Sequence, residues 1–282
     1  NLNGTGFIND QLSYNNIGSA ENIAGGTGSS RSTLLSQMAR INYSYDSRYL
    51  LTLTARRDGY SAFGANTNKY GTFPSLAVGW NIHNEDFMKN ADKVNNLKLR
   101  FSYGQTGNRG VNINQTKSLA GTVLYPFGGT AYTGTFLAGL GNPNLVWETT
   151  TTANLGIDFG FLNNRINGTV EIYHSNTDDL LLRRSIPALT GTNNIIDNIG
   201  EVRNKGLEFT VNTINVRNDN FSWETNVNFS TYRNEIVDLY GDGESDIPNR
   251  WFIGESLGAI FDYNMIGIWQ EGEDTGTFNA QP

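Results

Sequence analysis

Two histidines, His83 and His174, are the only imidazole side chains in this chain of 282 residues, and it has no cysteine. A Ser-His-Asp triad needs a histidine oriented by a carboxylate, and zinc sites draw on several histidines or cysteines. His174 falls near the end of one predicted strand and His83 just beyond another, so we expect them at opposite ends of the fold. Neighbouring acids such as Asp178 and Asp179 are common in loops and do not indicate a glycosidase pair. The sequence therefore predicts no enzymatic activity.

Three acids at alternating positions, Asp242, Glu244 and Asp246, lie in YGDGESD with a spacing that resembles a calcium-binding loop. An EF-hand, however, places a bidentate glutamate at its twelfth position, where this chain has Ile253. A solvated acidic loop is the simpler interpretation, and calcium held in another loop geometry is the alternative. No other cofactor is expected.

A glycine-rich stretch, AGGTGSSRST from Ala24 to Thr33, superficially resembles a phosphate-binding loop. It lacks the Gly-Lys-Ser/Thr ending and the flanking helix that such loops need. We therefore interpret it as a flexible loop.

Aromatic side chains gather in two long polar connections. Aromatic faces beside amides and hydroxyls suit sugar rings, by stacking together with hydrogen bonding. The same side chains could instead pack loop against loop or contact a partner protein that covers the site. Our candidate ligand contacts are Tyr125, Phe127 and Tyr132, with Phe136 nearby, in the first connection, and Arg250 and Trp251 in the second.

The composition excludes some classes of protein and leaves one membrane class open. The net charge is −7 and only 17% of residues are charged, so nucleic acid is not expected as a partner. The chain has no apolar run long enough for a transmembrane helix, and NLNGTGFINDQLSY at its start does not resemble a signal peptide. The mean hydropathy of −0.41 is typical of soluble proteins. Membrane β-barrels also average to a polar composition, because their strands alternate apolar and polar residues.

The clearest alternation lies in WETTTTANLGIDFG, from Trp147 to Gly160. One row of alternate residues is largely apolar and the other polar: Trp147, Thr149, Thr151, Ala153, Leu155, Ile157 and Phe159 against Glu148, Thr150, Thr152, Asn154, Gly156, Asp158 and Gly160. At about 3.3 Å per residue the stretch spans roughly 46 Å, or about 33 Å of height at a tilt of about 45°. The apolar band of an outer-membrane barrel is about 25 Å tall. We therefore expect the first row to face lipid and the second a wet lumen.

The same two-residue period recurs along the chain, and helical periodicity does not, apart from a short candidate at NEDFMKNADK. The alternating stretches include SQMARINYSYD, YLLTLTAR, SLAVGWNI, NLKLRFSYG, INGTVEIY, GLEFTVN and FSWETNVNFST. We predict an all-β chain with about eight clear strands and a ninth at Gly258–Gln270. In a barrel, Leu207, Phe209 and Val211 should face outward.

Short and long connections alternate strictly along the chain. The short turns are Asp46–Arg48, Leu162–Arg165 and Arg217–Asn220, with His83–Asn96 in a further short-turn position; the long connections are Asp58–Lys69, Thr106–Asn144, Thr177–Gly200 and Asn234–Leu257. All short turns should therefore lie at one end of the sheet, as in outer-membrane barrels, whose periplasmic turns are short and extracellular loops long. Aromatic residues gather near the short turns, as in an interfacial girdle: Tyr43, Tyr45, Tyr49, Phe159, Phe161, Phe221 and Trp223.

Several segments in series resemble the SusC-like (RagA-like) branch of TonB-dependent outer-membrane transporters. They are ARINYSYDSRYLLTLTARRDG, FPSLAVGWNI, NLKLRFSYGQTGN, NPNLVWETTTTANLGIDFGFLNNRINGTVEIYHSNTDDLLL, NIGEVRNKGLEFTV and IGESLGAIFDYNMIGIWQ, and the resemblance covers about Leu34 to Gln270. It implies a segment of a large plugged barrel, of roughly 22 strands, in the outer membrane of a Gram-negative bacterium of the Bacteroidetes type. The implied partners are TonB, acting through a plug that this chain lacks, a SusD-like surface lipoprotein that covers the barrel, and the lipid bilayer. The implied cargo is an oligosaccharide or a peptide.

The chain departs from the family pattern at one loop. Where the family often has DGSSRFG, this chain has DGYSAFG, with Tyr60 and Ala62 in place of a small and a basic residue. Any loop contact made by that basic residue is therefore in doubt.

The expected organisation is an extracellular loop-like segment at 1–33, barrel strands at 34–270 and a truncated loop at 271–282. Two other interpretations stay open: a complete eight-stranded barrel, and a soluble all-β glycan-binding protein. Our first hypothesis is an oligosaccharide importer, with a peptide importer of the same family as the alternative.

Overall fold

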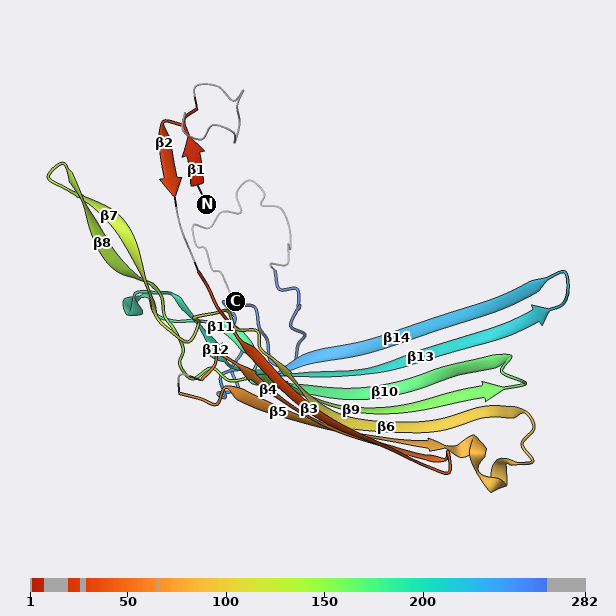
Figure 1. Cartoon of the computed structure of the whole chain (residues 1–282). Helices are drawn as coiled ribbons and strands as arrows, with labels where there is room; N and C mark the ends of the chain where they lie inside the picture. Colours follow the sequence, from red (N-terminus) through yellow and green to blue (C-terminus); the bar gives the residue numbers. More distant parts are fainter. Residues whose placement is uncertain (1, 8–19, 26–28, 65, 263–282) are drawn as a thin grey trace, which may run out of the picture.

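The computed structural model describes residues 2–7, 20–25, 29–64 and 66–262, and its main feature is one long antiparallel sheet (Figure 1). Its eight strands follow the order β14-β13-β10-β9-β6-β5-β4-β3. They are β3 (Leu34–Tyr45), β4 (Tyr49–Tyr60), β5 (Tyr70–Asn81), β6 (Val94–Asn108), β9 (Glu148–Phe161), β10 (Ile166–Asp178), β13 (Glu201–Arg217) and β14 (Ser222–Asp238). The predictions of an all-β antiparallel fold and of eight clear strands are confirmed.

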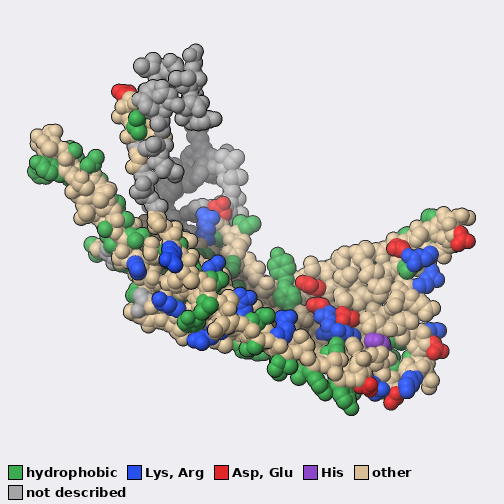
Figure 2. All heavy atoms as spheres, in the orientation of Figure 1, with side chains coloured by type: hydrophobic (Ala, Val, Ile, Leu, Met, Phe, Trp, Pro, Cys, Tyr) green, Lys and Arg blue, Asp and Glu red, His purple; other side chains and the backbone are tan. Residues whose placement is uncertain are grey.

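The outward face carries continuous apolar rows across the strands. Ile157 on β9 pairs with Val170 on β10, which pairs with Phe209 on β13, which in turn pairs with Phe229 on β14. Large apolar side chains on this face are exposed, and Figure 2 shows hydrophobic side chains gathered along the lower, convex side of the sheet. An apolar surface of this extent on an isolated chain marks a membrane or protein contact. Within the described residues no second sheet lies over Leu207, Phe209 and Val211, which agrees with a barrel wall and not with a soluble sandwich.

The other face is polar, and its side chains bond to one another across the strands. Thr150 and Thr152 on β9 lie 2.9 Å from Thr177 and Ser175 on β10, respectively, in hydroxyl–hydroxyl hydrogen bonds. Nearer the short turns, amide side chains form a chain from strand to strand: Asn228 to Asn226, Asn226 to Asn212, and Asn212 to Asn167. Hydroxyl and amide groups of this kind suit a water-filled lumen.

The two ends of the sheet differ as predicted. The short turns at Asp46–Arg48 and Leu162–Arg165 use positive φ angles, at Asp46 and Ser47 in the first and at Leu162–Asn164 in the second. The opposite end carries the long connections and three two-stranded sheets: β1 (Leu2–Thr5) with β2 (Asn22–Gly25), β7 (Leu119–Phe127) with β8 (Thr130–Gly139), and β11 (Leu181–Ser185) with β12 (Asn194–Asn198). Between β5 and β6 lie the 3₁₀ turns η2 (Ile82–Asn84) and η3 (Asp86–Met88), and a third, η4 (Ala188–Thr190), precedes β12.

Three expectations need correction or lie outside the described part. Trp147 does not face lipid: the chain leaves the ladder before Glu148, and the indole is buried at the long-loop end. The main sheet is not a closed eight-stranded barrel, because its order runs between two edge strands, β3 and β14. The predicted ninth strand falls mostly on residues 263–282, outside the described range. No helix in the described part is long and apolar enough to span a membrane.

A buried carboxylate closes the link between β5 and β6 at the short-turn end. Glu85 accepts hydrogen bonds from the Tyr49 hydroxyl at 2.7 Å, the Trp80 indole at 2.8 Å and Arg48 Nη1 at 3.2 Å. The hydrogen bonds from Tyr49 and Trp80 hold the pKa of the Glu85 carboxyl below its usual value. One carboxylate thus ties the start of β4 to the end of β5 and to the link that follows β5.

We expect Glu85→Gln to lower the unfolding temperature of the full-length protein at about pH 7, with a difference from the parent that shrinks toward zero below about pH 4. Because the pKa of Glu85 is lower in the folded than in the unfolded protein, its ionised carboxylate stabilises the fold at pH values above the unfolded-state pKa. This stabilisation is lost as the pH falls through the folded-state pKa and the carboxyl is protonated. Thermal unfolding at both pH values measures it. Glu244→Gln, on an exposed loop, is the control; a difference for Glu85→Gln that persists unchanged at low pH contradicts the expectation.

Candidate functional site: the long-loop end of the sheet

An aromatic cluster, here called the collar, lies where the long connections meet. It consists of Tyr60, Phe63, Phe73 and Trp147, with Ala62, Val111 and Leu145 packed among them. The rings of Phe63 and Phe73 have their centroids 5.2 and 5.6 Å from that of Trp147, tilted or edge-on to it. Such aromatic pairs add about 0.5–1.5 kcal/mol each beyond the area they bury. The collar is therefore a small hydrophobic core at the long-loop end of the sheet.

The segment Asn142–Glu148, here called the strut, joins the collar to two neighbouring loops. On one side Thr67 Oγ1 donates to the Leu145 carbonyl at 2.8 Å, and the Trp147 indole donates to the Lys69 carbonyl at 3.1 Å. On the other side Asn198 of β12 bonds to both backbone groups of Val146, at 2.8 and 3.1 Å. Because the strut's polar groups bond in both directions, it joins three long connections, Asp58–Lys69, Thr106–Asn144 and Thr177–Gly200, into one unit, here called the platform.

The loop that departs from the family pattern is part of this platform. Tyr60 and Ala62 are both buried in the collar. The Tyr60 hydroxyl donates to the Val111 carbonyl at 3.5 Å, and the Ala62 carbonyl accepts from Thr116 Oγ1 at 3.1 Å. An apolar cluster thus occupies the place where a basic loop residue was expected.

The aromatic candidates of the first connection lie together on the β7–β8 hairpin, which extends beyond the platform (Figure 1). Tyr125 and Tyr132 are directly paired across the two strands, and Phe127 ends β7 next to the turn. Alternation along the strands places these three rings and Phe136 on one face of the hairpin. All four are more than half exposed, and Phe127 is 74% exposed. The hairpin therefore presents an aromatic face that no described residue covers.

Arg250 and Trp251 lie apart from the hairpin, in the connection after β14. Trp251 exchanges two backbone hydrogen bonds with Asp246, at 2.8 and 2.9 Å, and Arg250 sits in the turn with a φ of +60°. Across 66–262, the range that holds both sets, no hydrogen bond, ion pair or ring contact joins either residue to the hairpin rings. The structure thus groups three of the five ligand candidates and leaves the other two in a separate loop.

Two carboxylates of the acidic loop, those of Asp242 and Asp246, accept hydrogen bonds from the protein. Asp246 accepts hydrogen bonds from the Tyr240 hydroxyl and from both nitrogens of Asn249, while Asp242 accepts one from the Glu244 backbone. Burial acts to raise the pKa of Asp246, but these hydrogen bonds outweigh it and keep the pKa below its usual value. Burial and Asp246 together raise the pKa of Tyr240 to about 12.

A hollow of about 510 Å³ beside this loop is lined by Arg184, Ser185, Ile199, Tyr240, Asp242 and Asp246. Arg184 brings a positive charge into it, which works against a bound cation. Among the residues that the structure describes, no group of three or more His, Cys, Asp or Glu lies close enough to hold a metal ion. Calcium binding by Asp242, Glu244 and Asp246 stays an untested hypothesis.

The two histidines are separated as expected. His83 lies in η2 at the short-turn end, where its Nδ1 is 3.3 Å from the Leu97 carbonyl. His174 lies on β10, toward the long-loop end, paired with Lys205. The glycine-rich stretch is described only in part, because residues 26–28 are outside the described range.

One ion cluster on the lumenal face was not predicted. Arg100 on β6 makes two 2.8 Å contacts with Asp158 on β9 and one of 2.6 Å with Glu171 on β10. Asn154 completes the cluster by donating to Glu171 at 3.2 Å. The alternation placed all four side chains on the inner row. It did not show that they would meet, because that depends on the strand register. The cluster links three strands inside the wall.

The strut and the collar were also missed. A signal for the strut was present in the sequence: an Asn-Pro-Asn stretch directly before Leu145 and Trp147 marks the end of regular pairing. The two-residue period hid it, because Trp147 is in phase with the lipid-facing row of β9.

An open sheet with an apolar outer face, a polar inner face and a loop platform at one end defines a piece of an outer-membrane barrel wall. The family described as TonB dependent receptor-like, beta-barrel, matches residues 1–277. The chain therefore belongs to the β-barrel family of TonB-dependent receptors, whose place is the outer membrane of Gram-negative bacteria.

Relatives within this family support the SusC-like resemblance. The chain is 36% identical to TonB-dependent receptor P26 of Formosa agariphila, over 95% of this chain and 28% of that protein. It is 42% identical to TonB-dependent receptor SusC of Bacteroides thetaiotaomicron, over 77% of this chain and 22% of that protein. It is also similar to a chain in the structure of the RagAB peptide transporter, with a TM-score of 0.72 and 28% identity, over 79% of this chain and 25% of that one. The chain thus spans less than a third of the length of these relatives.

Proposed function

We propose that the chain is part of the barrel of an outer-membrane importer, and that its long-loop end contacts the cargo on the extracellular side. The observation that carries the proposal is the exposed aromatic face of the β7–β8 hairpin, which extends from the platform at the end opposite the short turns. Because extracellular loops are the long ones in such barrels, this face points toward the outside of the cell.

The favoured cargo is an oligosaccharide. Tyr125 and Tyr132 stand side by side with their hydroxyls and ring faces exposed, a combination that stacks on sugar rings and bonds to their hydroxyls. A peptide is the second candidate, supported by the similarity to the RagAB peptide transporter. The mechanism in this proposal is capture at the loops, followed by passage through a lumen opened by a TonB-driven plug. The plug, and a SusD-like lipoprotein that covers the platform, belong to other parts of the assembly.

The proposal assigns no catalytic step to the chain. The described loops contain no pairing of His83 or His174 with a nucleophile, and the family is one of transporters and receptors.

We expect Tyr125→Ala and Tyr132→Ala in the full-length protein each to raise the Kd for its cargo about 10-fold, equivalent to about 1.4 kcal/mol of stacking and hydrogen bonding. Calorimetry in detergent, with defined oligosaccharides and defined oligopeptides as separate titrants, measures this and also decides the class of cargo. Leu124→Ala is the matched control, because Leu124 is exposed on the opposite face of the same strand. Equal effects of all three variants, or no binding of either class, would sink the proposal.

A further inference from the structure

The barrel wall has an open seam between β5 and β6. The two strands pair from Asn81 with Lys98 as far as Ser75 with Gly104. Beyond that point β5 continues to Tyr70 and β6 to Asn108, but they no longer pair with each other. Unpaired backbone is costly inside a bilayer, so the seam needs a local cause and a local cover.

Pro74 is the cause. Asn81 N–H donates to the Arg48 carbonyl at 2.7 Å, on the β4 side of β5. Backbone N–H groups alternate in direction along an antiparallel strand, so odd-numbered residues of β5 point to β4 and even-numbered ones to β6. Pro74 therefore stands where an N–H should bond to β6, and proline has none. The pairing of β5 with β6 ends at Ser75, the residue next to Pro74.

The lumenal side of the seam is covered by protein. The Phe73 side chain is buried and its ring lies directly against Gly107 of β6, where a Cβ atom would overlap it. The same ring packs on Trp147 of the collar. The seam is therefore sealed toward the lumen and open only toward the outside of the barrel.

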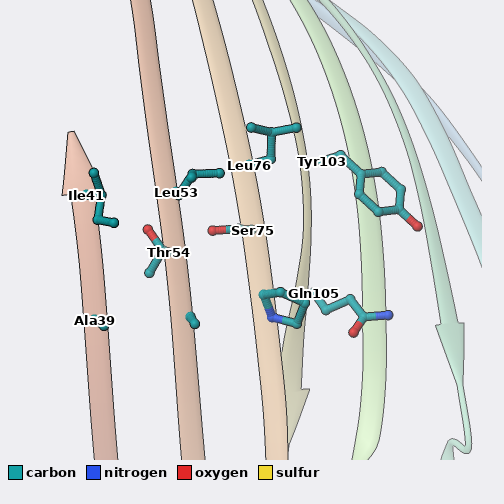
Figure 3. Close-up of a pocket in the computed structure, with 10 residues that line it drawn as sticks. Ala39, Ile41, Leu53, Thr54, Ser75, Leu76, Tyr103 and Gln105 are labelled. Atoms are coloured by element: carbon teal, nitrogen blue, oxygen red, sulfur yellow. The ribbon is translucent and has the colours of Figure 1, made fainter. Parts of the chain in front are cut away.

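On the outer side the seam forms the edge of an apolar groove of about 430 Å³ (Figure 3). Its floor is a row of small residues, Ala39, Ala55 and Pro74, which are paired in register across β3, β4 and β5. The bulkier row on its short-turn side consists of Ile41, Leu53, Leu76 and Tyr103. All these side chains belong to the outward row of their strands. A groove of this kind on a lipid-facing wall has room for a hydrocarbon chain.

One arginine, Arg57, lies next to the groove on its long-loop side. Arg57 follows Ala55 on the outward row of β4, paired with Gln37 on β3 and Thr72 on β5. Its guanidinium carbon lies 4.5 Å from the centroid of the Tyr70 ring, which holds it in place. Among the described residues no carboxylate pairs with it, whereas its neighbour Arg56, on the lumenal row, pairs with Asp58 at 2.7 Å. Arg57, on the outward row, thus has no carboxylate partner among the described residues, whereas Arg56, on the lumenal row, has one.

The height of Arg57 matches the headgroup boundary of the outer leaflet. It is eight residues beyond Tyr49, which lies among the aromatic residues near the short turns. That separation is about 26 Å along the strand and about 18–21 Å of height at the usual barrel tilt, within an apolar band about 25 Å tall. A long side chain at this depth can extend its charge to the interface.

We propose that the groove and Arg57 bind one phosphorylated lipid of the outer leaflet, namely a lipopolysaccharide molecule. An acyl chain lies along Ala39, Ala55 and Pro74 and covers the open seam. The phosphate of the headgroup binds the Arg57 guanidinium and accepts hydrogen bonds from Gln37 and Thr72. A site of this kind is independent of the imported cargo, because it faces away from the lumen.

Native mass spectrometry of the full-length protein in detergent, titrated with diphosphorylated lipid A, tests this site. We expect Arg57→Gln to weaken binding about 5-fold, since a basic residue at an anionic lipid surface contributes about 1 kcal/mol. Ala55→Phe should weaken it similarly, by filling the groove while the charge stays. Arg40→Gln removes a charge from the lumenal row of β3, and Val227→Phe enlarges an outward side chain on β14; both should bind as the parent does.

Three outcomes would overturn the proposal. Equal weakening by Arg57→Gln and Arg40→Gln would show a non-specific charge effect. Equal binding of dephosphorylated lipid A would remove the role of Arg57. Competition by inorganic phosphate as strong as that of the lipid would show an anion site that does not use the groove.

Discussion

Trp147→Ala should open the loop platform. The indole fills the centre of the collar and donates to the Lys69 carbonyl, and replacing a buried aromatic residue with alanine costs about 3–5 kcal/mol. The expected sign is faster hydrogen exchange at the amides of Asn66 and Val146, which bond across the platform to Pro143 and Asn198. A local loss of about 3 kcal/mol corresponds to exchange roughly 100-fold faster.

Trp223→Ala is the control for this experiment. Trp223 is 55% exposed, on the outward row of β14 near a short turn, so its loss should leave the platform amides unchanged. If both tryptophan variants accelerate exchange at Asn66 and Val146 equally, the collar is not what holds the platform together.

Arg100→Leu should destabilise the wall by about 1–3 kcal/mol in the full-length protein. It leaves Asp158 and Glu171 without the cation that separates them, and hydrogen bonds to charged groups contribute about 1.5–3 kcal/mol each. The lower end of the range allows for solvent screening, since the Arg100 side chain is 33% exposed. Adding Asp158→Asn and Glu171→Gln to Arg100→Leu should restore part of the loss, because the repelling charges are then gone. Urea unfolding in defined vesicles measures the difference.

Arg217→Leu provides the matched comparison. Arg217 pairs with Glu224 at 2.6 Å, as close as Arg100 to Glu171, but both side chains of this pair are more than half exposed. Exposed pairs contribute about 0–1 kcal/mol. Equal losses in the two arginine variants would contradict a special role for the lumenal cluster.

The strands of the barrel wall could be predicted from the sequence because each face of the sheet meets a single kind of environment. Lipid on one face and water on the other impose a period of two residues, and register then follows from the short turns. That is why β9 was located to within one residue, and why Leu207 and Phe209 were correctly placed on the outward row.

The platform could not be predicted in the same way. The position of Trp147 depends on the Lys69 carbonyl, to which its indole donates, and on the Asn198 side chain, which bonds to the preceding residue Val146; both are dozens of residues away in the sequence. The meeting of Arg100 with Asp158 and Glu171 likewise depends on β6 pairing with β9 across a long connection. The grouping of the hairpin aromatic residues could be predicted because it is local. The position of Arg250 and Trp251 relative to them could not, because no local rule relates two loops. A role of either set in ligand binding stays a prediction.

The tight turns lie at one end of the sheet and the long loops at the other, so an insertion has a different effect at each end. Closing a flexible loop costs only about 0.6 kcal/mol more for each doubling of its length. The 39 residues between β6 and β9 already contain the β7–β8 hairpin without any shift in the pairing of the wall strands, which runs unbroken from Leu97 with Phe159 to Asn108 with Glu148. Insertions at this end are therefore nearly neutral for the wall, while an insertion in the three-residue turn after Tyr45 would displace a whole hairpin register. The molecule thus keeps a fixed wall and a variable rim, so the loops can change in length and sequence while the membrane-crossing strands stay as they are.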